Sequence, residues 1–263
     1  MSYTQGAGAR IYWDTSGAGE PLLLIQGLGY TTEMWYRIRP ALAARFSTIA
    51  LDNRGVGRSD VPPGPYAIAT MAADAIAALD AAGVERAHVF GVSLGGMIAQ
   101  ELALRHPKRV RSLVLGCTAC GGPRAVPASP IVLSALGART LMTRLAGAQV
   151  LVPYIYDRAT PATRIEEDLA VRLQTYPSNE GYVAQLKGAA FWQSYSRLGQ
   201  IRAPTLVIHG ANDQLIPPQN GRVIAKAIPG AQLRILAQAS HIFFTDQPEA
   251  SCSAILEFLE MQP

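Results

Sequence analysis

The chain has 263 residues, of which 49% are hydrophobic, so it is long enough to form a globular unit with a large buried core. Its formal net charge of +4 is small and its basic residues are not clustered, so we expect no nucleic-acid partner. Residues 1–10 lack the apolar stretch of a signal peptide, and no run approaches the length of a membrane helix. We therefore expect a cytoplasmic protein without a membrane partner.

Short apolar runs alternate with longer periodic runs along most of the chain. The short runs predict strands and the long runs predict helices. This alternation indicates an α/β fold, with a mostly parallel, doubly wound sheet that binds ligands beyond the carboxyl ends of its strands. The expected strands are Arg10–Asp14, Leu22–Gln26, Phe46–Asp52, Ala87–Val92, Val110–Leu115, Pro204–His209 and Gln232–Leu236. The expected helices are Trp35–Ala44, Ile68–Ala82, Leu94–Arg105, Gln219–Ala227 and Pro248–Glu260.

The alternation breaks between residues 121 and 200, where helical stretches follow one another without convincing strands. We interpret residues 121–200 as an inserted helical cap, or lid, and residues 1–120 and 201–263 as the core. A cap of this kind would exclude water from a cleft and favour an apolar substrate. Its expected helices are Ser129–Leu145, Ile165–Tyr176 and Gly181–Tyr195. Most of the aromatic residues of the cap should form its own core, and some should face the cleft. These residues are Tyr154, Tyr156, Tyr176, Tyr182, Phe191, Trp192 and Tyr195.

Ser93 lies in the sequence Gly-Val-Ser-Leu-Gly-Gly, residues 91–96, between an expected strand and an expected helix. A strand that packs against the helix after it leaves almost no space at the turn, so small residues are needed on both sides of the serine. The strained turn then exposes the serine hydroxyl. This pattern predicts a nucleophile elbow, with Ser93 as the nucleophile.

A serine hydroxyl is a poor nucleophile at neutral pH, and it needs a histidine base that an acid orients. Of the four histidines, His241 lies on a loop after the last expected strand, where such a base would lie. His106 ends the helix that Ser93 opens and is too far along it to fold back. We interpret His209 as a strand-end residue that lines the cleft or pairs with the backbone. His241 is therefore the predicted base.

Asp213 is the predicted acid of this triad. It follows the strand that ends at His209, in a turn, so its carboxylate should lie at the same edge of the sheet as Ser93 and His241. A turn aspartate that caps its own backbone is the ordinary alternative. The other two aspartates between Ser93 and His241 fall in the helical region 121–200.

Together these features resemble the α/β-hydrolase fold superfamily over essentially the whole chain. Residues 51–59 resemble the family's Asp-x-Arg-Gly-x-Gly-x-Ser loop, and residues 23–29 take the place of its oxyanion loop. This resemblance implies that the backbone N–H groups of Leu28 and Leu94 form an oxyanion hole. Such fixed donors need no reorganisation when a tetrahedral intermediate develops negative charge.

One position departs from the family pattern, because the family usually has His-Gly where this chain has Gln26-Gly27. The glutamine amide donates and accepts hydrogen bonds but does not carry a proton in turnover. We therefore expect a working oxyanion hole with altered substrate preference, while a weakened or non-hydrolytic function stays open.

Cys117 and Cys120 form a Cys-x-x-Cys pattern, which is also found in redox sites and in half of some zinc sites. The chain has no second cysteine pair and no matching histidine cluster, so we expect no metal ion. We interpret Cys117 as a small residue at the edge of the sheet. The substrate contacts that we expect are Gln26, Gly27, Cys117, Thr118 and Trp192.

The sequence thus predicts a cofactor-free serine hydrolase of the esterase or lactonase type, with a small-molecule carbonyl substrate. The substrate is expected to be a small to medium, largely apolar carboxylic ester or lactone, cleaved through an acyl-enzyme. The same triad serves carbon–carbon bond hydrolases, thioesterases, perhydrolases and lyases, and a non-hydrolytic small-molecule binder is a further alternative. The Ser93 nucleophile speaks against haloalkane dehalogenases and epoxide hydrolases, which use a carboxylate there. The acyl group, the pathway and a homo-oligomeric state stay open.

Overall fold

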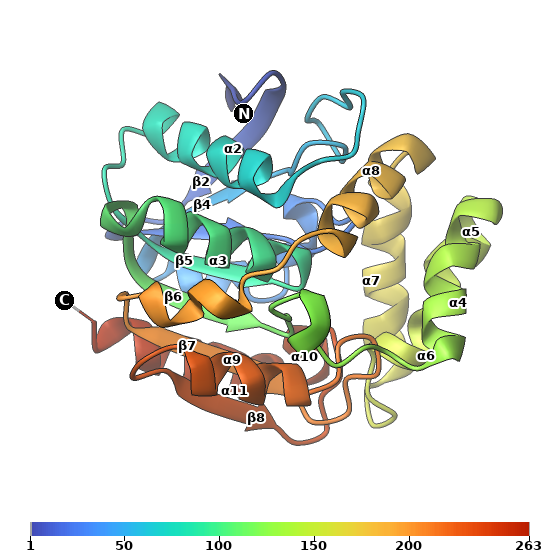
Figure 1. The fold of residues 1–263 in the computed structure, drawn as a ribbon. Coiled ribbons are helices and arrows are strands. Elements are labelled where there is room, and N and C mark those ends of the chain that lie inside the picture. Colours follow the sequence, from blue (N-terminus) through green and yellow to red (C-terminus); the bar gives the residue numbers. More distant parts are fainter. Residues whose placement is uncertain (1, 263) are drawn as a thin grey trace.

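The computed structural model describes residues 2–262. Within these residues eight strands form one sheet, in the order β1-β2-β4-β3-β5-β6-β7-β8 (Figure 1). The pairs β1–β2 and β2–β4 are antiparallel and the other pairs are parallel, so the sheet is mostly parallel, as the sequence predicts. The strands are β1 Ser2–Gln5, β2 Arg10–Ser16, β3 Glu20–Ile25, β4 Phe46–Leu51, β5 Ala87–Val92, β6 Val110–Gly116, β7 Thr205–Gly210 and β8 Gln232–Leu236.

Strands β3, β5, β6 and β7, which are neighbours in the sheet, are almost entirely buried, which explains their continuous apolar sequences. Their register brings Leu24, Phe90, Val114 and Leu206 side by side across the sheet. All four side chains belong to the hydrophobic core on one face of the sheet. This parallel register also aligns the carboxyl ends of the strands along one edge.

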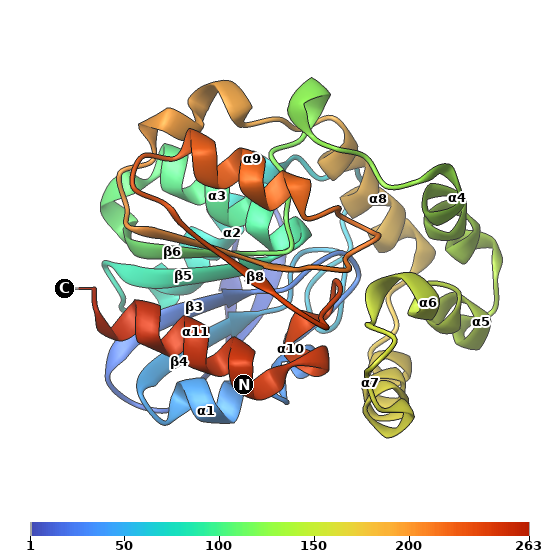
Figure 2. The same cartoon turned by 90° about the horizontal axis from the view of Figure 1, so that it is seen from below.

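Helices cover both faces of the sheet (Figure 2). On one face lie α2, α3 and α9, and on the other lie α1 and α11, each with its own hydrophobic core. These helices are α1 Arg39–Ala43, α2 Ile68–Ala81, α3 Leu94–Arg105, α9 Gln219–Ala227 and α11 Pro248–Glu260, and the short α10 spans Phe243–Asp246. The 3-10 turns are Thr32–Trp35, Pro107–Arg109, Gly122–Arg124, Arg139–Leu141 and Tyr195–Gln200.

Two details at the start of the chain differ from expectation. The helix expected at Trp35–Ala44 is instead a 3-10 turn followed by α1, because Pro40 fits only the first turn of a helix. The strand β1 was not expected from its polar sequence. It lies at the sheet edge, where alternate side chains stay exposed, so it needs little apolar content.

Helices α4 to α8 lie between β6 and β7 in the chain and stand at one end of the sheet (Figures 1 and 2). We call residues 121–200 the helical insertion. The single helix expected at Ser129–Leu145 is wrong, since the chain turns after α4 and Thr143 caps a new helix, α5, by accepting a hydrogen bond from the Ala146 N–H. The helices of the insertion are α4 Pro130–Ala138, α5 Arg144–Gln149, α6 Val152–Ile155, α7 Ala162–Gln174 and α8 Asn179–Ala190.

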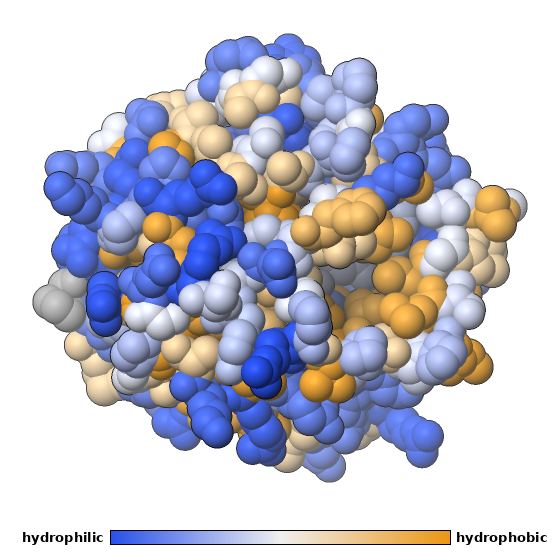
Figure 3. Space-filling view, in the orientation of Figure 1, coloured by the Kyte–Doolittle hydropathy of each residue, from blue (hydrophilic) through white to orange (hydrophobic). Residues whose placement is uncertain are grey.

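The surface near the insertion is partly apolar. Figure 3 shows a hollow on the side of the molecule where the insertion lies, with hydrophobic residues around it. Leu141 and Phe191 of the insertion are largely exposed. None of the helices within residues 2–262 has both the length and the apolar character needed to cross a membrane.

Candidate active site

Ser93 occupies a strained turn between β5 and α3. Its φ of 56° and ψ of −119° lie in a region that residues with a side chain rarely adopt. A Cβ atom on Gly91 would lie 2.2 Å from the Gly95 carbonyl oxygen, and one on Gly95 would lie 2.1 Å from the Ile25 carbonyl oxygen. The strand, the turn and the helix therefore fit together only with glycine at these two positions, which is the local geometry of a nucleophile elbow.

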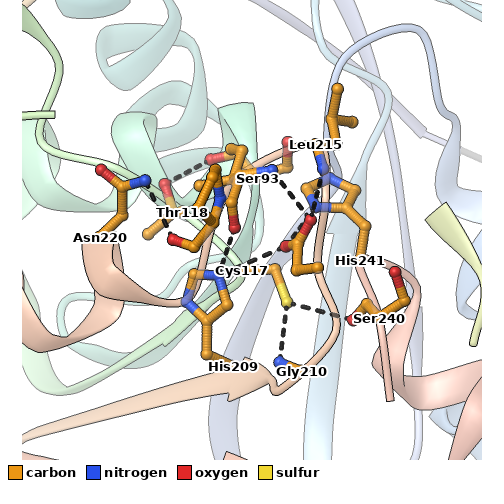
Figure 4. Close-up of polar contacts among 12 residues, drawn as sticks. Ser93, Cys117, Thr118, His209, Gly210, Leu215, Asn220, Ser240 and His241 are labelled. Carbon is orange, nitrogen blue, oxygen red and sulfur yellow. Dashed lines mark hydrogen bonds and ion pairs between the residues drawn. The ribbon is translucent and has the colours of Figure 1, made fainter. Parts of the chain in front are cut away.

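Asp213 follows β7 and His241 follows β8, so both lie at the same edge of the sheet. Figure 4 shows His241 there. His241 Nδ1 is 2.8 Å from Asp213 Oδ2. The other carboxylate oxygen of Asp213, Oδ1, accepts hydrogen bonds from the backbone N–H groups of Leu215 and Ile216, at 2.9 and 2.8 Å. Burial alone would raise the pKa of Asp213, but the charge of His241 and the hydrogen bonds of His209 and His241 lower it to about 2. Asp213 is thus a carboxylate at neutral pH.

The hydrogen bond to Asp213 fixes the proton arrangement of the His241 ring. A carboxylate only accepts hydrogen bonds, so the His241 Nδ1 carries the proton and donates it. The Nε2 atom is then the basic nitrogen of the neutral ring. Because Ser93 and His241 line the same cavity, this arrangement suits proton transfer from a serine hydroxyl.

His209 contacts the acid from its other side. It is fully buried, and its Nε2 lies 2.8 Å from the Ile216 carbonyl oxygen and 3.3 Å from Asp213 Oδ2. Since a carbonyl oxygen only accepts, Nε2 donates, and it reaches both the backbone and the acid. Of the two alternatives expected for His209, the structure has the pairing with the backbone.

The cavity that contains Ser93 and His241 has a volume of about 30 Å³. Most of its lining is apolar, with side chains from the core such as Phe244 and from the insertion such as Leu136 and Ile155. Gln26, Gly27 and Leu28 also line it, so the expected oxyanion loop and the nucleophile meet at one site.

Two backbone N–H groups beside Ser93 are free to bind an oxyanion. A Cβ atom on Gly27 would lie 3.1 Å from the Ser93 Cβ, so the loop approaches the nucleophile closely. Within residues 2–262, neither the Leu28 nor the Leu94 backbone N–H has an acceptor. Leu94 is the first residue of α3, where backbone N–H groups lack partners in the helix. The arrangement can therefore stabilise negative charge next to Ser93.

Gln26 is buried and turns its side chain back onto its own loop. Its Oε1 accepts a hydrogen bond from the Gly27 N–H at 3.1 Å, and its backbone oxygen accepts one from Asn53 Nδ2 at 3.0 Å. Its Nε2 has no partner among the described residues, although it is buried. A glutamine at this position thus shapes the loop and leaves one donor unused beside the cavity.

Gln185 supports the same loop, although its sequence gives no signal of this. The residue comes from α8 and is fully buried. Its Oε1 accepts a hydrogen bond from the Gly29 N–H at 2.9 Å, and its Nε2 donates one to the Arg54 carbonyl oxygen at 2.8 Å. The insertion therefore holds the expected oxyanion loop through a single side chain.

Three expected substrate contacts lie outside this cavity. The Cys117 thiol is buried between the Gly210 N–H and the Ser240 carbonyl oxygen. Thr118 donates its hydroxyl to the Ser93 carbonyl oxygen at 2.7 Å, below the elbow, and Trp192 donates its indole N–H to Glu101 at 2.9 Å. In this structure the side chains of Cys117, Thr118 and Trp192 do not line the cavity, so their contact with a substrate stays a prediction; Figure 4 shows Cys117 and Thr118.

One cluster in the described part of the chain has the residue types of a metal site. Donor atoms of Cys117, His209 and Asp213 lie within 4.8 Å of one another. Burial raises the pKa of the Cys117 thiol well above its ordinary value, so the thiol stays protonated, and Asp213 is already bound by His241. His209 is likewise bound to the Ile216 carbonyl oxygen, so each of the three side chains already has a hydrogen-bond partner within the protein. The three cysteines are all free thiols.

Comparison with known proteins identifies the family. A family model described as the alpha/beta hydrolase fold matches residues 20–248. The chain belongs to this family, and it is thus an α/β hydrolase, which confirms the family and the fold class expected from its sequence. RutD from Azorhizobium caulinodans, named as a proposed carbamate hydrolase, is 34% identical over 265 residues, with 98% of each chain covered. A poly(3-hydroxyalkanoate) depolymerase from Ectopseudomonas oleovorans is 34% identical over 245 residues, which cover 92% of this chain and 85% of that protein.

Solved structures agree with this assignment. The enol-lactonase from Burkholderia xenovorans LB400 is 26% identical and superimposes with a TM-score of 0.88, covering 98% of this chain and 100% of its own. A hydrolase from Pseudomonas aeruginosa PA01 is 32% identical, with a TM-score of 0.85 and coverage of 98% of this chain and 97% of its own. The whole described chain, including the helical insertion, therefore has counterparts among solved hydrolases.

Proposed function

We propose that the protein is a cofactor-free serine hydrolase that cleaves a carboxylic ester or lactone through an acyl-enzyme. The observation that carries this proposal is the geometry at the sheet edge. Ser93 sits on the strained turn and shares a cavity with His241, whose Nδ1 is 2.8 Å from the ionised Asp213. The relatives named as a depolymerase and an enol-lactonase support ester and lactone chemistry.

In the first half of the reaction the Ser93 Oγ attacks the substrate carbonyl carbon. His241 Nε2 takes the hydroxyl proton, and the Asp213 carboxylate stabilises the imidazolium that forms. The carbonyl oxygen becomes an oxyanion, which accepts hydrogen bonds from the free N–H groups of Leu28 and Leu94. The C–O bond to the leaving group then breaks, and His241 returns its proton to that alkoxide.

In the second half a water molecule replaces the leaving group. His241 takes a proton from the water as the water oxygen attacks the acyl carbon. The second tetrahedral intermediate uses the same two N–H donors. It collapses to the carboxylic acid, and His241 gives the proton back to the Ser93 Oγ, which restores the free enzyme.

The small apolar cavity bears on the substrate. A volume of about 30 Å³ holds about two water molecules but not an ester. Residues of the insertion, such as Leu136, Leu151 and Ile155, cover Ser93 from the solvent side. An ester therefore needs a wider site than this one, and we infer that side chains or helices of the insertion shift to admit it and then close over the reacting carbonyl.

The experiment is a substrate panel with matched variants. Wild type, Ser93→Ala and the exposed control Ser134→Ala are each tested on 4-nitrophenyl esters, lactones, acyl thioesters and vinylogous diketones. The proposal expects ester or lactone turnover that Ser93→Ala abolishes and Ser134→Ala retains. Retained turnover in folded Ser93→Ala would contradict it. Turnover confined to thioesters or diketones, or ligand binding without turnover, would instead favour one of the alternatives on the same fold.

A further inference from the structure

A buried cation lies in the same cavity as the nucleophile. Arg139 follows α4, is only 4% exposed, and lines the cavity together with Ser93 and His241. Arg139 is the one arginine or lysine side chain in that lining, and the lining has no aspartate or glutamate. Arg139 is thus the one permanently charged side chain in the lining of the catalytic cavity.

The other two buried arginines have an acid nearby. Arg54 binds Asp74 in two parallel hydrogen bonds of 2.6 and 2.7 Å. Arg172 lies in the field of the buried Asp168; its terminal nitrogens also have no hydrogen-bond partner within residues 2–262, but it does not line the catalytic cavity. Arg139 forms no ion pair with any residue in the range 2–262, and its one hydrogen bond runs from Nε to the Tyr176 hydroxyl at 3.1 Å. Its two terminal nitrogens have no protein acceptor in this range.

Two tyrosine rings hold the guanidinium in place. Its central carbon lies 4.8 Å from the centroid of the Tyr176 ring and 4.2 Å from that of Tyr182. A Cβ on Gly147 would lie 2.2 Å from the Tyr176 hydroxyl and 3.3 Å from the Arg139 Cγ. The packing of Arg139 against Tyr176 therefore requires glycine at position 147. Contacts with aromatic faces stabilise a cation while leaving its N–H groups free to donate. The guanidinium is therefore held rigidly, and its donors stay available.

The guanidinium also lies beside the oxyanion loop. A Cβ on Gly29, the residue after Leu28, would lie 3.3 Å from the Arg139 Nη1. A group bound by Arg139 is thus held next to the site where the substrate carbonyl is expected. Such a group belongs to the substrate itself, because nothing in the described part of the protein balances this charge.

We propose that Arg139 binds a carboxylate of the substrate, so that the enzyme acts on esters or lactones that carry a second, free carboxylate group. This inference rests on the proposed hydrolase function. A planar guanidinium matches a carboxylate through two parallel N–H···O bonds, and such charge-assisted bonds are strong where water is excluded. A buried cation without a counter-ion is costly, and a substrate carboxylate removes that cost on binding. Neutral esters lack this gain.

The test compares two esters that differ only in charge, mono(4-nitrophenyl) adipate and its methyl ester. For wild type we expect kcat/KM for the free acid to exceed that for the methyl ester by about tenfold or more. Arg139→Met should lower kcat/KM for the acid by about 10-fold to 100-fold more than it lowers kcat/KM for the methyl ester. Arg139→Lys, which keeps the charge but not the planar fork, should fall in between.

A matched control keeps the interpretation specific. Arg124 stacks on Tyr195 at 5.1 Å, outside the cavity, so Arg124→Met removes a similar contact without touching the site. It should leave the ratio of the two esters unchanged. If Arg139→Met does not fold, Arg139→Gln and Arg139→Lys supply the comparison. Of these two variants, only Arg139→Lys should retain a preference for the free-acid ester over the methyl ester.

A binding measurement separates this inference from the proposed function. Calorimetry on Ser93→Ala, with and without Arg139→Met, measures binding of monomethyl adipate, which carries one carboxylate. If Arg139→Met abolishes the binding of monomethyl adipate, the carboxylate site is supported. If, in addition, no ester is hydrolysed by the wild type, only the hydrolase proposal fails. Equal turnover of the two esters in wild type, with an equal decrease for both in Arg139→Met, would overturn the inference.

Discussion

The edge of the sheet at the carboxyl ends of its parallel strands, which we call the sheet end, and the helical insertion position their polar groups by different means. At the sheet end, strand ends and backbone bonds place the groups: Ser93 sits on a strained turn, and backbone N–H groups hold Asp213. In the insertion, side chains bind other side chains, as where the buried Asp168 accepts hydrogen bonds from Tyr156 and Thr245. Under the proposed function, the sheet end supplies the reaction chemistry, whereas the insertion supplies substrate choice and closure.

The largest expected effect comes from removing the nucleophile or the base at the sheet end. We expect Ser93→Ala and His241→Ala each to lower kcat by about a millionfold, and the double variant to be no worse, because the two groups act as a unit. Kinetics of the three proteins on one ester would measure this. Effects that multiply in the double variant would show that the two residues act independently, against the proposed triad.

The acid comes next in size. Asp213→Asn should lower kcat by about 10⁴-fold, because an amide reverses the preferred proton position on His241. His241 Nδ1 now donates to the carboxylate, and an Asn side chain would present an N–H group there. The kcat of Asp213→Asn and its thermal midpoint should be measured together. A folded variant with nearly full activity would remove Asp213 from the mechanism.

The lowered pKa of Asp213 also predicts a pH dependence of stability. With a pKa of about 2 against the ordinary 3.8, the folded state favours the carboxylate, so its contribution is present above pH 3.8 and is lost as the pH falls towards 2. This contribution is about 2 kcal/mol. Urea unfolding of wild type and Asp213→Asn, from pH 6 to pH 2, should give free energies of unfolding whose difference changes by that amount. A constant difference would contradict the pairing.

The stability of the insertion is the fourth test. Asp168 accepts hydrogen bonds from Tyr36, Arg37, Tyr156 and Thr245, and it joins the insertion to the core. Asp168→Asn leaves the buried Arg172 without the nearby anion and should lower the free energy of unfolding by about 3 to 5 kcal/mol.

A neighbouring acid provides the control for that test. Glu167 binds the same Arg37 but is largely exposed, so Glu167→Gln should cost at most about 1 kcal/mol. Chemical unfolding of both variants would measure the two losses. Similar losses would mean that the Asp168 network does not carry the stability of the insertion.

The smallest expected effect concerns Gln185, where the insertion meets the sheet end. Gln185→Leu removes the acceptor of the Gly29 N–H and should lower kcat by about 10-fold with little change in KM, because a looser oxyanion loop stabilises the transition state less. Asn179→Ala is the control, since it removes a hydrogen bond to Thr140 at the exposed surface of the insertion. A change in KM alone would point to substrate binding rather than to the loop.

Much of the sheet end could be predicted from sequence because its signals are local. Buried parallel strands are continuous apolar runs, and the helices α3, α9 and α11 begin and end at the residues expected. The approach of Asp213 to His241 follows from topology, since both residues come after neighbouring parallel strands. Rules that act over a few residues, or over adjacent strands, are therefore enough for this part.

The insertion could not be predicted to the same depth because its key contacts join distant residues. Gln185 and Gly29 are 156 residues apart, and nothing in the sequence around either one indicates the bond. The direction of a side chain is equally hidden: Thr118 follows an expected strand and Trp192 lies in an expected helix, yet they bond to the Ser93 backbone and to Glu101. The pairing of Arg139 with two tyrosine rings also required the folded insertion.

The most direct test of the central claim is intact-mass spectrometry after treatment with an activated fluorophosphonate. The reagent reacts with a serine hydroxyl only where a base and an oxyanion hole activate it. Wild type should gain the mass of one adduct, and Ser93→Ala should gain none. An unlabelled wild type that is folded, or an adduct that persists in Ser93→Ala, would contradict the assignment of Ser93 as the activated nucleophile.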